Sequence, residues 1–149
     1  MSLQNNVMDK LKEAMRSKDT VALESLRAIK SAILLAQTDK GAKGELTEED
    51  ELKLLQKLVK QRRDSAAVYQ DQDREDLAKP ELEQVAVIEQ FLPEQMSDEA
   101  IKNAVALIIS QAGASSMKDM GKVMGIASKQ LAGKADGKAI SNVVKALLG

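Results

Sequence analysis

The 149-residue sequence contains no cysteine and no histidine. These absences exclude disulfides, zinc sites of the Cys/His type, and catalytic arrangements built on a histidine base or a cysteine nucleophile. Aromatic residues make up only 1% of the chain: one tyrosine, Tyr69, one phenylalanine, Phe91, and no tryptophan. Platforms of aromatic rings that stack single-stranded bases are therefore excluded as well.

The common signatures of cofactor and phosphate chemistry are also missing. The chain has no Gly-x-x-x-x-Gly-Lys loop, no Gly-x-Gly-x-x-Gly turn and no nucleophile elbow. Its acidic clusters are typical of helix starts and do not form an identifiable acid/base pair. We therefore expect no cofactor, no metal and no self-sufficient active site.

The charge is nearly balanced overall but unevenly distributed. Twenty-two basic and twenty-three acidic residues give a net charge of −1. Residues 97–149 hold seven lysines against four acids (+3), whereas residues 1–96 hold fifteen basic against nineteen acidic residues (−4). A basic C-terminal third indicates an anionic partner. A solvated lysine-rich surface is the simpler interpretation.

Nothing in the sequence indicates export or a membrane. The N-terminus lacks a charged region followed by an apolar core, and the longest apolar stretch, 104–109, is too short to cross a bilayer. We expect a cytoplasmic protein that makes no membrane contact.

Apolar residues recur at helical spacing along most of the chain, and no stretch alternates like a strand. Thr47 and Ser97 are placed to cap helices that begin with acids, and Gly113 is placed to end one. Ser116 and Asp119 have the spacing of a capping box. The polar run 38–44 predicts a loop.

We therefore predict an all-α protein with two parts. An N-terminal multi-helix domain covers residues 1–93, and a three-helix bundle tail covers residues 97–149 after a short linker. Pro80 predicts a break or kink near Lys79, because the residue before a proline disfavours the α conformation.

The last two predicted helices carry the candidate site. At 100° per residue, Lys118, Lys122 and Lys129 fall within about 40° of one another, opposite a methionine-rich apolar stripe. Gly125 lies inside the lysine stripe, where it costs about 1 kcal/mol relative to alanine. The candidate contacts for an anionic partner are Lys118, Lys122, Gly125, Lys129, Lys134, Lys138, Asn142 and Lys145.

Gly125 and Arg62 each admit two interpretations. Gly125 either lets a phosphate backbone approach closely or allows two helices of the bundle to cross. Arg62 falls on an apolar stripe of its helix, where an arginine usually extends to solvent or pairs with an acid. Anion binding by Arg62 is the less favoured alternative.

The glycine- and lysine-rich segments have a recognisable pattern. Residues 113–125, GASSMKDMGKVMG, and 133–137, GKADG, resemble the tail domain of the B subunit of tRNA-dependent amidotransferases. Upstream, LKEAM (11–15), LRAIK (26–30), KQRRDS (60–65), REDL (74–77) and FLPEQ (91–95) resemble the YqeY family, the freestanding relatives of that tail. The similarity extends over nearly the whole chain.

The resemblance implies an all-α fold and a module related to the tRNA-holding part of a larger enzyme. It implies that the lysines contact tRNA or a complex of tRNA with the amidotransferase. The family label, carbon–nitrogen ligase with glutamine as amide donor, describes chemistry performed by domains that this chain lacks. Three hypotheses follow: a non-catalytic RNA-binding module, which we favour; a helical adaptor that binds a protein partner; and an enzyme that completes an amide-transfer system.

Overall fold

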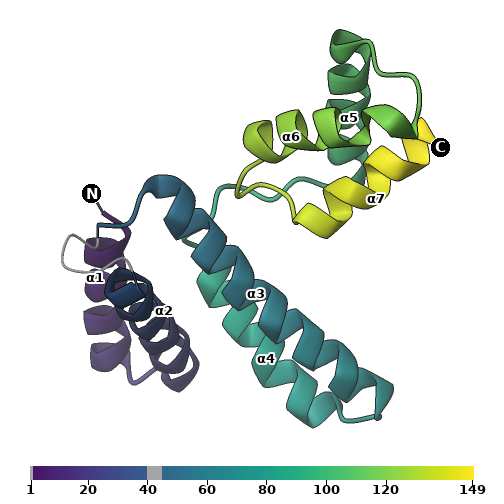
Figure 1. Cartoon of the computed structure of the whole chain (residues 1–149). Helices are drawn as coiled ribbons and strands as arrows, with labels where there is room; N and C mark the ends of the chain where they lie inside the picture. The colour runs from purple at the N-terminus through teal and green to yellow at the C-terminus, as the bar shows by residue number, and fades with distance from the viewer. Residues whose placement is uncertain (1, 40–44) are drawn as a thin grey trace. The chain divides into compact units, whose positions relative to one another are not determined.

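The computed structural model describes residues 2–39 and 45–149, and over these residues the chain is helical without strands. This confirms the predicted all-α class. The helices are α1 (Leu3–Ser17), α2 (Thr20–Asp39), α3 (Glu48–Asp71), α4 (Glu75–Glu89), α5 (Asp98–Ala112), the 3-10 turn η1 (Met117–Asp119), α6 (Met120–Gln130) and α7 (Gly137–Leu148) (Figure 1).

The chain divides into two compact units, Met1–Leu92 and Pro93–Gly149, which we call unit 1 and unit 2. Each unit has its own hydrophobic core, and each core is built from the apolar stripes of its own helices. Residues 93–97, between α4 and α5, are not helical.

Unit 1 contains α1 to α4. Helices α3 and α4 lie side by side as a hairpin, and α2 contacts α1, α3 and α4 (Figure 1). The core of unit 1 consists of Leu3, Val7, Leu11, Ala14, Leu26, Ile29, Ile33, Leu55, Val59, Val85 and Ile88.

Unit 2 is a three-helix bundle of α5, α6 and α7, each of which contacts the other two. Val105, Val123 and Val144 are completely buried, one from each helix. They place the core at the centre of the bundle and leave the opposite side of each helix in solvent.

Local signals set several helix ends as the sequence predicts. Thr47 and Asp50 form a reciprocal capping box at the start of α3, and the Ser97 side chain accepts a hydrogen bond from the Ala100 N–H at the start of α5. Gly113 ends α5 in the left-handed region, with φ of 67°. These motifs need only residues close in sequence, which is why the sequence suffices to find them.

The predicted break at Lys79–Pro80 is wrong, because α4 is continuous from Glu75 to Glu89, whereas a kink there stays a prediction. Pro80 is the sixth residue of the helix, so the hydrogen bond it cannot make would run back to the helix's first turn. Ala78 before it and Val85 and Ile88 after it are buried. Packing on both sides of the proline thus overrides the local preference against helix.

Two smaller expectations also need correction. Thr38 and Asp39 are the last residues of α2 and do not belong to a loop, and residues 40–44 of that expected loop lie outside the described residues. At the second site, the Ser116 side chain does not cap a helix, and the Asp119 carboxylate accepts from the Ser115 N–H at 3.0 Å. The reason is that a 3-10 turn with a tighter repeat precedes α6.

Candidate functional site

One side of α6 combines lysines with glycines. Lys118, Gly121, Lys122, Gly125 and Lys129 form what we call the α6 face, and all five are exposed. On helical geometry they lie within about 100° of arc, opposite the buried Val123 and Ala127. Lys118 lies in η1, and the 120° step of a 3-10 turn still leaves it on this side.

The two glycines of the α6 face have no packing role. A Cβ added at Gly121 or Gly125 would meet nothing within 4 Å. The interpretation of Gly125 as a helix-crossing residue within the bundle is therefore wrong. Gly125, in the interior of α6, destabilises the helix by about 1 kcal/mol relative to alanine. At both glycines the helix backbone has no side chain covering it.

A second basic surface belongs to α7. Lys138, Asn142 and Lys145 are exposed on the side of α7 opposite Ile140, Val144 and Leu148, and we call them the α7 face. This arrangement follows directly from the apolar spacing of the helix.

Lys134 lies in the turn between α6 and α7, with its side chain exposed. The turn is fixed by the segment that precedes α5: the Met96 N–H donates to the Lys134 carbonyl at 2.9 Å, and the Gln95 side chain donates to the Gly133 carbonyl at 2.7 Å. Gly133 has a φ of 75° and is buried, so the turn requires glycine there. The position of Lys134 is thus set by backbone contacts.

The lysines of unit 2 have no acidic partners. Unit 2 is described in full, and none of its seven lysines forms an ion pair. By contrast, the ion pairs among the described residues belong to unit 1: Lys10–Glu13, Lys53–Glu49, Lys60–Asp64, Arg63–Glu89, Arg74–Asp76 and Lys79–Glu83. The positive charges of unit 2 are therefore available to an external anion.

One of these lysines also has an internal contact. Lys122 Nζ lies 3.3 Å from the carbonyl oxygen of Ala112, the last residue of α5. A cation at a helix C-terminus interacts favourably with the carbonyl groups that lack helical partners. The sequence pattern did not reveal this contact, because the two residues meet only when α5 and α6 pack.

Arg62 lies in unit 1 and is engaged internally. Its Nε donates to Gln84 Oε1 at 2.8 Å, and its Nη1 donates to the Leu58 carbonyl at 3.1 Å. The Gln84 amide in turn donates to Glu24 at 3.2 Å, so the chain of contacts joins α3, α4 and α2. This arrangement gives Arg62 a structural role within unit 1.

The perturbed carboxyl groups lie at helix starts in unit 1. The Arg74 side chain, which donates two hydrogen bonds to Asp76, lowers the pKa of that carboxyl. Partial burial, and then the neighbouring Glu48, raise the pKa of Glu51. Asp76 is exposed in the first turn of α4, Glu51 is half-buried in the first turn of α3, and neither carboxyl group lines the hollows between α1 and α2 or between α2 and α3. Their shifts therefore do not indicate a catalytic pair.

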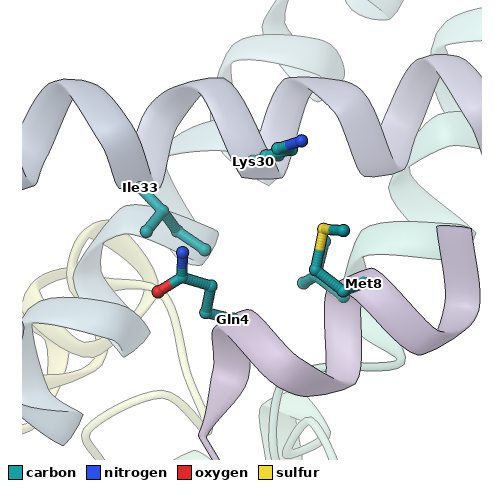
Figure 2. Close-up of a pocket in the computed structure, with 5 residues that line it drawn as sticks. Gln4, Met8, Lys30 and Ile33 are labelled. Carbon is teal, nitrogen blue, oxygen red and sulfur yellow. The ribbon is translucent and has the colours of Figure 1, made fainter.

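The described helices of unit 1 leave hollows between them. A small one between α1 and α2 is bordered by Gln4, Met8, Lys30 and Ile33 (Figure 2). A larger groove of about 320 Å³ separates α2 from α3 and is lined by Ala32, Leu35, Ala36, Asp39, Leu54, Lys57, Leu58 and Gln61. Over residues 2–39 and 45–149 no cluster of acids has the arrangement of a metal site.

Comparison with known proteins places the chain in a family. A family model described as YqeY-like protein matches residues 4–148, nearly the whole chain. The chain therefore belongs to the YqeY-like protein family, which confirms the resemblance to the YqeY family seen in the sequence.

The relatives include proteins with a mitochondrial name. A protein of Clavispora lusitaniae called "Altered inheritance of mitochondria protein 41, mitochondrial" is 36% identical over 103 residues, covering 68% of this chain and 59% of that protein. The protein of the same name in Pyrenophora tritici-repentis is 30% identical over 146 residues, covering 93% of this chain and 77% of that protein. An uncharacterized Schizosaccharomyces pombe protein is 32% identical over 97 residues, covering 65% of this chain and 77% of that protein.

These names bear on the expected location. The relatives from Clavispora lusitaniae and Pyrenophora tritici-repentis are both called mitochondrial, so the cytoplasmic expectation for this chain stays a prediction. In the part of the chain that the structure describes, no helix is long and apolar enough to cross a membrane.

Proposed function

We propose that this chain is a non-catalytic RNA-binding module that holds tRNA, free or in complex with an amidotransferase, through Lys134 and the lysines of the α6 and α7 faces. The observation that carries the proposal is that the α6 and α7 faces present exposed lysines with no acidic partner.

Free lysines suit a phosphate partner for an electrostatic reason. A lysine that already pairs with a carboxylate must give up that contact before it binds a phosphate, and the unit 2 lysines have no such contact to lose. Binding to a nucleic acid releases condensed counterions, so each lysine–phosphate contact contributes more at low salt. The net charge of the whole chain, −1, does not oppose this, because unit 2 has seven lysines against five acids, a net charge of +2.

The glycines support close approach. At Gly121 and Gly125, on the same side of the helix as Lys122 and Lys129, a partner can reach the helix backbone without meeting a side chain of the glycine positions. Packing within unit 2 does not compensate for the helix stability lost at Gly125. A phosphate backbone that lies along the α6 face would compensate for it through close contact with the exposed helix backbone.

The choice of RNA among polyanions rests on resemblance. Residues 113–125 and 133–137 of unit 2, which include Lys118, Lys122 and Lys134, resemble the tail domain of the tRNA-dependent amidotransferase B subunit. Membership of the YqeY-like protein family agrees with that resemblance without specifying a ligand.

The test is binding of the full chain to bulk tRNA across a salt series. The variant Lys118→Glu/Lys129→Glu/Lys138→Glu reverses charge on both faces and leaves Lys122, which contacts Ala112, in place. The matched control Lys12→Glu/Lys57→Glu/Lys102→Glu changes the same net charge at exposed lysines of α1, α3 and α5.

We expect wild type and control to bind with a log–log salt slope of about −3 to −4, as four phosphate contacts require. The triple variant on the two faces should lose at least about tenfold in affinity at low salt. Equal loss in the control variant, or no loss in either, would contradict the proposal.

The alternative of a protein-binding adaptor is favoured by one observation. The groove between α2 and α3 is largely apolar, and Leu35 on its border is 66% exposed. An apolar-faced helical peptide is the kind of partner that such a groove accommodates. If tRNA does not bind, crosslinking from position 35, with Leu35→Ser as the comparison, tests this groove directly.

A further inference from the structure

The side chains of unit 2 form an unusual set for a nucleic-acid-binding surface. Residues 93–149 contain no arginine, histidine, phenylalanine, tyrosine or tryptophan. The two aromatic residues of the chain, Tyr69 and Phe91, both belong to unit 1. Lysine therefore supplies every positive side chain on the α6 and α7 faces.

The side chains of unit 2 include none of the groups on which unpaired bases stack. Proteins that recognise single-stranded RNA stack the bases on aromatic rings or on guanidinium planes, and each such stack contributes about 1–3 kcal/mol. Lysine has neither a ring nor a planar fork, and it acts as a point charge on a flexible stem. Unit 2 can contact phosphates but offers no surface on which a base can stack.

We infer that the RNA contacted by unit 2 is a paired stem, bound through its phosphates and without base contacts. This inference rests on the function proposed above. It adds that the ligand is recognised by the charge density of a double helix, and that the sequence of the stem does not matter.

Charge density favours the duplex over the single strand. A duplex binds with a log–log salt slope of about −0.9 per phosphate contact, compared with about −0.7 for a single strand. With about four lysine–phosphate contacts the slopes are roughly −3.6 and −2.8. If the two ligands bind equally at about 1 M salt, the duplex binds about tenfold more tightly at about 50 mM.

Asn142 does not provide an exception. It is exposed on the α7 face, between Lys138 and Lys145 in the sequence. An exposed asparagine on a helix can donate and accept hydrogen bonds with adenine when the helix enters a major groove. That contact requires a helix in the major groove, and the major groove of A-form RNA is too deep and narrow to admit side chains. Asn142 is therefore left to hydrogen-bond to phosphate or to a ribose hydroxyl.

The experiment compares three RNA probes with the full chain. One is a duplex of about 16 base pairs, similar in length to the span of known double-stranded RNA-binding domains. The second is the same duplex with its base pairs permuted at constant composition. The third is an unstructured polyuridine strand with the same number of phosphates.

We expect both duplexes to bind equally within about threefold, and about tenfold more tightly than polyuridine at about 50 mM salt. Between about 50 and 200 mM salt, duplex affinity should fall roughly 150-fold and polyuridine affinity roughly 50-fold. Asn142→Ala should weaken the two duplexes by the same factor.

The possible failures can be told apart. Polyuridine binding as tight as duplex binding, lost in the Lys118→Glu/Lys129→Glu/Lys138→Glu variant, would overturn this inference and leave RNA binding intact. A difference of tenfold or more between the two duplexes would also overturn it. No binding to any of the three probes, or to tRNA, would overturn the proposed function itself.

Discussion

Lys122 Nζ donates a hydrogen bond of 3.3 Å to the carbonyl oxygen of Ala112. A lysine of the α6 face therefore also provides a hydrogen-bond donor for the C-terminus of α5. The same ammonium group is exposed to solvent. Lys122 thus links the stability of the bundle to the candidate interface, and its two roles must be separated experimentally.

The variant Lys122→Met removes both roles and keeps the aliphatic stem. Because the hydrogen bond is exposed, we expect the free energy of unfolding to fall by no more than about 1 kcal/mol. The salt slope of tRNA binding should become less steep by about 0.7 to 0.9, the value of one phosphate contact. Denaturant unfolding and a salt titration measure the two effects. An unchanged slope would mean that Lys122 stabilises the bundle but does not contact RNA. The matched control is Lys102→Met, at an exposed position of α5.

The glycines of the α6 face should show opposite effects on stability and binding. Gly125→Ala is expected to raise the free energy of unfolding by about 0.5–1 kcal/mol, because the new Cβ meets nothing and alanine favours helix. The same change should weaken tRNA binding, since the methyl group keeps a phosphate away from the backbone. The measurements are a urea midpoint and a binding isotherm.

Gly113→Ala is the contrasting control for Gly125→Ala. Gly113 ends α5 with φ of 67°, a conformation that costs a non-glycine residue about 1–2 kcal/mol, so stability should fall. If Gly125→Ala gains stability and binds tRNA as tightly as wild type, the bare backbone has no role in binding.

Arg62 should matter for folding and not for RNA. Arg62→Met removes the hydrogen bonds to Gln84 and to the Leu58 carbonyl, and we expect unit 1 to lose about 1–3 kcal/mol of stability. Arg63→Met breaks only an exposed ion pair with Glu89 and should cost less than about 1 kcal/mol. Circular dichroism in urea measures both. A salt-sensitive loss of tRNA affinity in Arg62→Met, with stability unchanged, would contradict this assignment.

Two carboxyl groups give pH effects of opposite sign. Because the folded-state pKa of Glu51 is raised, the folded chain holds that proton more tightly than the unfolded chain, and charging Glu51 disfavours folding as pH rises. Glu51→Gln should therefore stabilise the protein at pH 7, and the gain should vanish as pH falls below the ordinary glutamate range, about 4.3.

Asp76 should behave in the opposite way. Its pKa is lowered in the folded state by Arg74, so its contribution to stability is present at neutral pH and is lost as pH falls through that lowered value. Asp76→Asn should therefore destabilise at pH 7 and have no effect at low pH. Urea midpoints measured from pH 3 to pH 7 test both variants, and a shared sign would contradict the account of their surroundings.

Features that depend on nearby residues could be predicted from the sequence. The capping box of Thr47 and Asp50 and the glycine end of α5 at Gly113 involve residues within one helical turn. The exposed position of Lys118, Lys122 and Lys129 follows from helical spacing, because the apolar stripe must face the core. The family was recognisable for a similar reason, since its motifs are short and contiguous.

Features set by packing could not be predicted. Pro80 lies within a helix because Ala78 and Ile88 on its two sides are buried in unit 1. The conformational preference of Lys79 before the proline contains no information about this burial. Helical spacing predicts that Met117 and Leu147 lie on the apolar sides of their helices, yet they are 45% and 37% exposed. Met117 lies in the 3-10 turn, whose phase differs from that of α6.

The contacts of Arg62 and the surroundings of Gly125 could not be predicted from the sequence either. The sequence indicates an anomaly at Arg62, but only the structure identifies Gln84, 22 residues away, as its partner. It indicates a bare position at Gly125, but only the structure shows that no neighbouring helix fills it. Gly121, four residues earlier, belongs to the same face and could have been found from that spacing.

The most direct single measurement is the salt slope of tRNA binding in the wild-type chain and in Lys118→Glu/Lys129→Glu/Lys138→Glu. Removal of three phosphate contacts predicts a slope less steep by about 2 to 3, with the Lys12→Glu/Lys57→Glu/Lys102→Glu control unchanged. If wild type and both variants share one slope, the lysines of the α6 and α7 faces do not bind RNA.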